Sequence, residues 1–196
     1  MSKHRTYELK QRAEAVASTR RRITEAAVAL HESVGPGRTS VSEIARRAGV
    51  DRVTVYRHFP DEAALFRSCA QHYAAAHPLP DPAQWAEPAE PRERLRGALT
   101  SIYGYYERNE AMLANVARDA EHMPAVAAAG GYRRQWLAEV EQGLAQGWDG
   151  DVPQMRHAVA LTLDFRTWQT LVRKRGLSTR QAIRLAVAMV GGAACR

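Results

Sequence analysis

The stretch SVSEIARRAGVDRVTVYRHF, residues 40–59, constrains the fold more than any other part of the chain. Ser40 and Glu43 have the spacing of a capping box, in which each side chain binds the backbone of the other residue at a helix start. Gly49 stands where a short helix would end, because glycine enters the left-handed conformation without strain. The stretch therefore predicts one short helix that stops at Gly49 and a second helix directly after it.

The second helix exposes more polar side chains than packing against the first helix requires. Asp51 is suited to be its N-cap, and Val50 and Val55 have the spacing of a hydrophobic staple. Val50, Val55 and Phe59 are therefore expected to pack inward. The outward-facing side chains are then Arg52, Val53, Thr54 and Tyr56. Two helices around a glycine turn, the second with a polar and basic start, are typical of a helix-turn-helix.

In a helix-turn-helix, the start of the second helix lies in the major groove of DNA. Arg52 can pair with guanine through two hydrogen bonds, which discriminates against a wrong base by about 1–3 kcal/mol. Val53 and the methyl group of Thr54 can contact thymine methyls. Tyr56 and His58 can reach phosphates, which orient a protein without specifying sequence. The residues predicted to contact DNA are Ser40, Arg52, Val53, Thr54, Tyr56, Arg57 and His58. The alternative is a helix corner without a nucleic-acid partner, as many all-α proteins contain.

The positive charge of the chain lies almost entirely in its first third. The net charge is +7. Residues 1–60 hold 12 Lys/Arg and 6 Asp/Glu, a net of +6, whereas residues 61–196 hold 16 and 15, a net of +1. Such an asymmetry is the electrostatic signature of a surface that faces nucleic acid. A solvated basic face with no partner is the alternative that composition alone leaves open.

The rest of the chain is also expected to be helical. Apolar residues at helical spacing predict a helix over residues 19–34, which the GPGR sequence at 35–38 ends. Residues 6–17 fit a separate helix, a continuation of that helix, or a mobile arm. A further helix is expected at 62–76, followed by a proline-rich connector at 77–91. Several more helices follow, and no stretch has a convincing strand pattern, so the fold class is all-α.

Other classes of protein find little support in the sequence. The two cysteines, Cys69 and Cys195, are far apart and lack metal-ligand spacing. No apolar run reaches the roughly 18 residues of a membrane span, and none follows the N-terminal charges as in a secretory signal. No histidine pair or glycine-rich loop has a metal- or phosphate-binding pattern. The chain is therefore expected to be cytoplasmic, without metal or cofactor, and not an enzyme. Asp119, Glu121 and His122 are the one place to look for catalysis, and a helix end explains them equally well.

The stretch TSVSEIARRAGVDRVTVYRHFPDEAALF closely resembles the DNA-binding motif of TetR-type (tetracycline-repressor family) transcriptional regulators. The shared elements are the Thr/Ser-Val before Ile44-Ala45, then Ala48-Gly49-Val50, Thr54-Val55-Tyr56 and His58-Phe59. The family's upstream pattern R-x-x-I-x-x-A-A-x-x-L appears as Arg20, Ile23, Ala26, Ala27 and Leu30. The resemblance covers about residues 20–66 and departs from the family at two positions. Val53 stands where a small residue is common. Glu62 stands where a lysine that contacts phosphate is common, so that contact is expected to be absent.

The resemblance implies an all-α fold with an N-terminal three-helix helix-turn-helix domain, followed by an α-helical ligand-binding and dimerisation domain. In these terms the chain divides into a basic N-terminal extension at 1–18, a DNA-binding domain at 19–78 with its helix-turn-helix at 40–59, and an effector-binding and dimerisation domain at 79–196. The basic residues of the extension can follow a DNA groove or form a solubilising tail. These residues are Lys3, Arg5, Lys10 and Arg12.

The resemblance also implies a function, because the family consists of homodimeric regulators that bind double-stranded DNA. The chain is expected to be a sequence-specific regulator, most often a repressor, that a small-molecule ligand releases from its operator. Recognition helices one DNA turn apart, about 34–36 Å, would read a pseudo-palindromic operator. The last two helices, about 152–174 and 178–190, would pair with a second chain. The apolar stripe expected at this interface is Ile183, Ala186, Val187 and Val190. A monomer that buries the stripe internally is the alternative.

By the same resemblance, an effector pocket would lie among the helices between residues 62 and 172. Its candidate lining residues are Tyr103, Tyr106, Met112, Trp136, Phe165 and Trp168. Its candidate polar contacts are Arg118, His122 and His157. Large apolar residues at helical spacing belong to cores more often than to pockets, so a plain core is the alternative. A DNA-binding protein without any effector is the other function left open.

Overall fold

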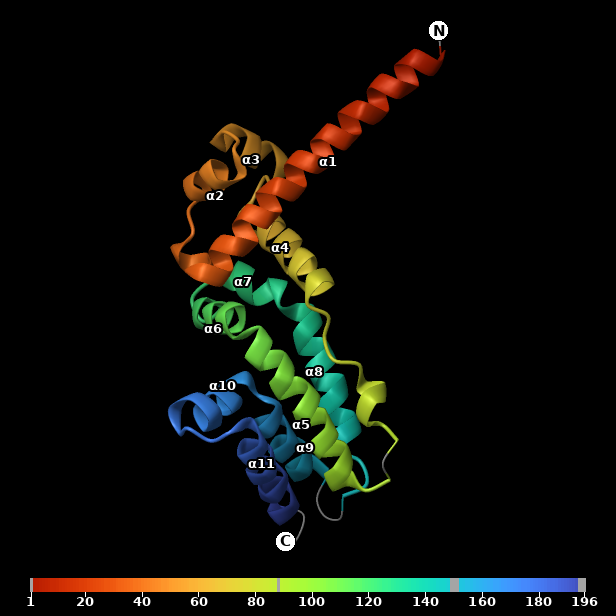
Figure 1. The fold of residues 1–196 in the computed structure, drawn as a ribbon, viewed down its shortest axis with the longest axis vertical. Coiled ribbons are helices and arrows are strands. Elements are labelled where there is room, and N and C mark those ends of the chain that lie inside the picture. Colours follow the sequence, from red (N-terminus) through yellow and green to blue (C-terminus); the bar gives the residue numbers. More distant parts are fainter. Residues whose placement is uncertain (1, 88, 149–151, 194–196) are drawn as a thin grey trace. The chain divides into compact units, whose positions relative to one another are not determined.

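The computed structural model describes residues 2–87, 89–148 and 152–193, and every regular element in these ranges is helical (Figure 1). The all-α prediction is therefore confirmed. The described residues form two compact units: Met1–His77 with Ala114–Gly130, and Pro78–Leu113 with Gly131–Arg196. The first unit thus takes in residues 114–130, which lie far along the chain from the segment 19–78. Within the described ranges, no helix combines the length and the apolar character needed to cross a membrane.

The first unit is built around a long helix and the helix pair that follows it. Its elements are α1 (Ser2–Ser33), the 3-10 turn η1 (Pro36–Arg38), α2 (Val41–Ala48), α3 (Arg52–His58), α4 (Glu62–Ala76), the C-terminal half of α6 (Glu110–Asp119) and α7 (Pro124–Ala129). The capping box at the start of α2 is formed as predicted, since the Glu43 N–H donates to Ser40 Oγ and Glu43 Oε2 accepts from the Ser40 N–H. Gly49 ends α2 with φ 64° and ψ 42°, in the left-handed region. Asp51 caps α3 through the Thr54 N–H at 2.6 Å.

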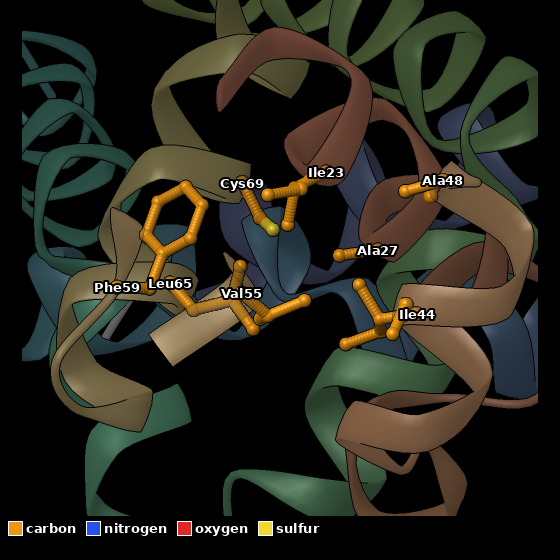
Figure 2. Close-up of a cluster of buried hydrophobic side chains, with 10 residues drawn as sticks. Ile23, Ala27, Ile44, Ala48, Val55, Phe59, Leu65 and Cys69 are labelled. Carbon is orange, nitrogen blue, oxygen red and sulfur yellow. The ribbon is translucent and has the colours of Figure 1, made fainter. Parts of the chain in front are cut away.

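One apolar cluster holds these helices together (Figure 2). Side chains from α1, α2, α3 and α4 point toward one another in it, and most are almost fully buried. Its central members are Ile23, Ala27, Ile44, Ala48, Val55, Phe59, Leu65 and Cys69. Val55 and Phe59 are 1% and 2% exposed, so their predicted inward orientation is confirmed. Burial raises the pKa of the Cys69 thiol to about 12, which leaves it protonated and inert.

For residues 6–17 the sequence left three alternatives open: a separate helix, a continuation of the next helix, or a mobile arm. These residues continue α1 without a break, so the chain has one helix of 32 residues, about 48 Å long. Residues 7–17 are exposed throughout, because the apolar cluster begins only at Ile23. Leu9 and Val16, which share a helical face with Ile23, are 60% and 56% exposed. Figure 1 shows this part of α1 extending beyond α2 and α3.

The second unit packs its helices around buried aromatic residues. Its elements are η2 (Pro82–Trp85), α5 (Pro91–Arg108), the first turn of α6, α8 (Gly131–Leu144), α9 (Val152–Leu163), α10 (Phe165–Trp168), the π-helical segment η3 (Gln169–Lys174) and α11 (Thr179–Ala193). The prediction of one continuous helix over 152–174 is wrong, because the helix is interrupted at Asp164. Asp164 caps α10 through the Arg166 and Thr167 N–H groups. The carbonyl groups of Thr162 and Leu163, freed at the break, accept hydrogen bonds from two buried tyrosines.

The apolar stripe on α11 faces the interior of its own chain. Ile183, Ala186, Val187 and Val190 are all at most 7% exposed, and α11 packs on α5 and α9. The assignment of these four residues to a dimer interface is therefore corrected, because a side chain already buried in the core is not available to a second chain. The stripe marks the side of α11 that is buried within its own chain.

Candidate nucleic-acid interface

The turn between α2 and α3 is fixed by backbone hydrogen bonds and by ionised caps. The Gly49 and Val50 N–H groups donate to Arg46 O and Ala45 O, at 3.3 and 3.0 Å. The Ser40 backbone and hydroxyl donors lower the pKa of Glu43. Hydrogen bonding to Thr54 likewise lowers the pKa of Asp51, so both caps are ionised at neutral pH. The start of α3 is thus held in place by local contacts.

The side chains predicted to contact DNA lie on the outer side of this helix pair. Val53 and Tyr56 are 58% and 49% exposed. Arg52 and Arg57 are exposed, and Thr54 and His58 are half-buried. These six residues lie on one short helix, whose inward side chain, Val55, is buried in the core. The structure therefore brings them together on one solvent-facing surface of α3, which we call the α3 face.

Ser40 differs from the other six candidates because its side chain is already engaged. Its hydroxyl donates to Glu43 Oε2 at 2.9 Å and accepts from the Glu43 N–H at 3.2 Å. Its structural role is to start α2. Glu62, the departure from the family pattern, lies in the first turn of α4 directly after the N-cap Asp61. A carboxylate at that position interacts favourably with the helix dipole, which gives Glu62 a role in the helix without DNA.

Two arginines of α1 hold the C-terminal ends of both helices. Arg22 Nη2 donates to the carbonyl of Ala48 and, at 3.1 Å, to that of Gly49. Arg20 Nη1 donates to His58 O, and its guanidinium lies 4.1 Å from the centre of the Phe59 ring. The last carbonyls of a helix lack partners within the helix, so a cation placed there satisfies them and the dipole together. Arg20 was recognised in the sequence as part of the family's upstream pattern, but its contacts with His58 and Phe59 could not be read from the sequence.

Replacing Arg22 with alanine is expected to lower the free energy of unfolding by about 1–2 kcal/mol, because two carbonyl groups at the end of α2 lose their charged donor. Chemical denaturation followed by circular dichroism measures this change. Arg21→Ala is the matched control, since Arg21 is the exposed neighbour on the same helix. Equal losses in the two variants would contradict the role assigned to Arg22.

The residues proposed for an effector pocket form part of the second unit's core. The rings of Phe165 and Trp168 lie 5.4 and 6.0 Å from that of Tyr106, and Tyr103 lies 6.2 Å from it. We call these four residues the aromatic cluster. Met112 is buried and Trp136 is half-buried, while His122 and His157 are exposed. The groove that the structure shows in this unit, about 540 Å³, has a different lining: Pro78, Leu79, Pro80, Asp81, Gln84, Thr100, Ser101, Gly104 and Arg108.

The aromatic cluster contains one buried donor without an acceptor. Tyr103 and Tyr106 donate their hydroxyl protons to Thr162 O and Leu163 O, at 2.8 and 2.6 Å. The indole Nε1 of Trp168 is fully buried and has no hydrogen-bond partner among the described residues. Arg173 lies over the same indole ring at 4.9 Å from its centre and pairs with Glu110 at 2.8 Å. The cluster is therefore satisfied except at the Trp168 N–H.

The acidic and histidine residues that suggested a catalytic site have structural roles or stand apart. Asp119 accepts from the Gly37 N–H and from Arg118, so its carboxylate is engaged. His122 is exposed. Over the described ranges, His, Cys, Asp and Glu nowhere gather in a group of three or more that could hold a metal ion.

Comparison with known sequences gives matches to less than a third of the chain. Residues 23–69 match the family model for bacterial regulatory proteins of the tetR family. An HTH-type transcriptional regulator of Mycobacterium bovis is 43% identical over 60 residues, which are 31% of this chain and 32% of that relative. One of Mycobacterium tuberculosis is 42% identical over 59 residues, 30% of this chain and 31% of that relative. The match thus spans about a third of the length of these relatives.

Comparison with solved structures extends over most of the chain. A TetR family transcription regulator from Marinobacter aquaeolei is similar with a TM-score of 0.57 and 21% identity, over 94% of this chain and 97% of that one. A TetR-family regulator from Streptomyces coelicolor gives a TM-score of 0.59 and 17% identity, over 89% and 78%. At these identities the likeness concerns the fold. The sequence match over the helix-turn-helix is therefore to the tetR family of bacterial regulatory proteins, and the fold over most of the chain is similar to that of solved TetR-family regulators.

Proposed function

We propose that the chain acts as a homodimeric repressor, which binds a pseudo-palindromic DNA operator and leaves it when a small-molecule effector binds. The observation that carries this proposal is the α3 face, where polar and basic side chains lie exposed on a helix whose ends are both fixed. A helix that only packed against α2 would not need exposed Val53 and Tyr56. Both have a use in the major groove, where apolar groups contact thymine methyls and polar tips reach phosphates.

The α3 face divides into base-reading and phosphate-binding residues. Arg52 and Val53 stand in the first turn of α3, which in a helix-turn-helix meets the base edges. Thr54 follows them, and its backbone N–H is used by the Asp51 cap while its methyl group is free to contact bases. Tyr56, Arg57 and His58 lie toward the C-terminal end of α3. We assign the first three to sequence readout and the last three to the DNA backbone.

Dimerisation is assigned to the outer side of α11 together with α9. Leu185 and Met189 are four residues apart on α11, and therefore share a helical face. They are 41% and 48% exposed, on the side opposite the buried stripe, and Leu161 of α9 is 53% exposed. α9 and α11 pack against each other within the chain. Exposed apolar residues on two adjoining helices are what a second copy of the chain would cover, and they replace the stripe first predicted for this role.

The effector site is assigned to the aromatic cluster, on account of the unpaired Trp168 N–H. Buried donors in proteins are almost always paired, and an exception calls for a water or a ligand. We propose that the effector carries an acceptor oxygen for this N–H on a largely apolar body. Release from DNA would require a coupling of only about 1–3 kcal/mol between the two sites.

A thermal-shift screen of apolar compounds with a carbonyl, ether or hydroxyl oxygen tests this assignment. A true effector at 100 times its Kd is expected to stabilise the folded chain by about 2.7 kcal/mol. Trp168→Phe removes the donor and is expected to weaken the same compound about 5- to 30-fold. Trp148→Phe is the matched control, because the Trp148 indole already donates to Leu144 O at 2.9 Å. A compound that binds both variants like the parent chain would place the effector elsewhere.

Selection of bound duplexes from a random DNA pool tests the repressor proposal as a whole. The proposal predicts enrichment of an inverted repeat, with half-sites about 10 base pairs apart or a multiple of that spacing. Enrichment of a single unpaired half-site would contradict the dimer. A pool that stays random would contradict sequence-specific binding itself.

A further inference from the structure

The turn that joins α1 to α2 is held by side chains from a distant part of the chain. α1 ends at Ser33, so its last carbonyl groups have no partner within the helix. Asn115 Nδ2 donates to His31 O and Glu32 O, at 3.1 and 2.8 Å. Arg118 Nη2 donates to Val34 O at 3.0 Å. Each of these donors comes from the part of α6 that belongs to the first unit.

The third contact fixes the turn itself. Asp119 Oδ2 accepts from the Gly37 N–H at 2.8 Å, inside the 3-10 turn η1. Asp119 is only 9% exposed and its other oxygen pairs with Arg118 Nε at 2.7 Å. Arg118 Nη1 also donates to Asn115 Oδ1 at 2.9 Å. Asn115, Arg118 and Asp119 therefore form one connected group, which we call the α6 clamp.

The clamp explains the glycines of the GPGR sequence. Gly35 has φ 95°, a conformation that other residues rarely adopt. A Cβ atom there would lie 2.1 Å from Arg118 Nη2 and 2.6 Å from Asp119 Oδ2. At Gly37 a Cβ atom would lie 3.2 Å from the Asp119 carboxyl carbon. The turn is therefore shaped both to reverse the chain and to receive the clamp.

Charge within the clamp is balanced by arginine. Burial opposes ionisation of Asp119, but hydrogen bonds from Arg118 and the Gly37 N–H outweigh it and hold the pKa of the carboxyl below its usual value. Burial lowers the pKa of neighbouring His31 from 6.5 to about 4, against the opposing pull of Asp119. His31 is thus neutral at neutral pH, with its ring 5.4 Å from that of Phe66 in α4. The Arg118–Asp119 ion pair of the clamp therefore also forms hydrogen bonds with backbone groups of the turn.

We propose that Asn115, Arg118 and Asp119 are positioning residues for DNA reading, because they set the direction in which the chain leaves α1 and enters α2. The turn leads within three residues to Ser40, the N-cap of α2, and Thr39 Oγ1 donates back to Gly35 O at 2.8 Å. α2 is followed directly by α3, whose outer surface is the α3 face. The inference rests on the proposed function, since it concerns how well that face meets the DNA.

The clamp is distinct from the core that keeps the unit folded. Ile23, Ile44 and Val55 hold α1, α2 and α3 together through apolar contact. The clamp instead contacts backbone groups at the end of α1 and in η1 through hydrogen bonds. Its loss is therefore expected to leave the helices folded while the turn, and with it the approach of α2, becomes less defined.

The test is DNA binding by the full-length chain with Asp119→Ala, Asp119→Asn or Asn115→Ala, measured on the selected operator and on random duplex. Asp119→Ala is expected to lower operator affinity about 10-fold and to leave random-duplex affinity within about 2-fold, because nonspecific binding needs only charge. Asp119→Asn keeps an acceptor for the Gly37 N–H, so a smaller loss is expected. Glu32→Gln is the matched control, since it removes the same charge at the end of α1 from an exposed side chain.

Three outcomes are informative. A lower operator-to-random ratio in the clamp variants, with Glu32→Gln unchanged, supports the inference. An unchanged ratio in Asp119→Ala, or equal losses on both duplexes, would overturn it and leave the clamp with a role in stability alone. A parent chain without any operator preference would instead overturn the proposed function, on which the inference rests.

Discussion

Arg52→Ala is expected to lower affinity for the preferred operator about 10- to 100-fold while affinity for random duplex falls far less. The first turn of α3 presents Arg52 to solvent, so its guanidinium is available for a guanine edge. Two hydrogen bonds to one base contribute about 1–3 kcal/mol of discrimination, which the alanine variant loses. The variant should therefore accept base changes at one position of each half-site that the parent chain rejects.

Tyr56→Ala provides the contrast, because its contact is assigned to the DNA backbone. It is expected to weaken binding to operator and random duplex by the same factor, and to leave the order of preference among operators unchanged. Competition binding with operators changed at one position at a time distinguishes the two variants. If Arg52→Ala and Tyr56→Ala lost affinity equally on both kinds of duplex, the division of the α3 face into reading and positioning residues would be wrong.

Leu185→Glu combined with Met189→Glu is expected to give a folded monomer that binds operator at least 100-fold more weakly. Both side chains are substantially exposed, so charges there cost the isolated chain little. In a dimer the same charges would be buried without partners, which is strongly unfavourable. A monomer also reaches only one half-site at a time, and loses the gain in effective concentration that the second half-site gives.

Sedimentation velocity measures the assembly state of this variant, and circular dichroism shows whether it is folded. Tyr132→Glu is the control, because Tyr132 of α8 is 68% exposed and lies outside the surface assigned to the dimer. A dimer that persists with both glutamates present would place the interface elsewhere. A dimer lost equally in the control would point to a general effect of added charge.

Local sequence signals predicted the geometry of the helix-turn-helix segment well. The capping box at Ser40, the left-handed Gly49 and the Asp51 cap each depend on residues within a few positions of one another, so their geometry follows from spacing alone. The inward orientation of Val55 follows from the same logic. These features positioned the α3 face, although the contacts of its side chains with DNA stay a prediction.

Contacts between distant segments could not be read from the sequence. The stripe on α11 was recognised as apolar, but periodicity does not state whether a buried face meets its own chain or a second copy. The break at Asp164 is stabilised by Tyr103 and Tyr106, two residues more than fifty positions earlier. Likewise, Asp119 resembled a catalytic residue until its partner at Gly37, 82 positions away, was seen. Each of these features depends on contacts between residues that are far apart in the sequence.

Fluorescence-anisotropy binding to the DNA immediately upstream of the chain's own gene tests whether the α3 face recognises a specific sequence. The binding is titrated with salt and compared with binding to random duplex. Sequence-specific recognition predicts binding at least about 1,000-fold tighter than to random duplex. It also predicts a steep linear fall of log K with log salt, as cationic side chains displace counterions from phosphates. Equal, weak binding to this DNA, to the random duplex and to every member of a random pool would contradict the assignment of the α3 face to sequence-specific recognition.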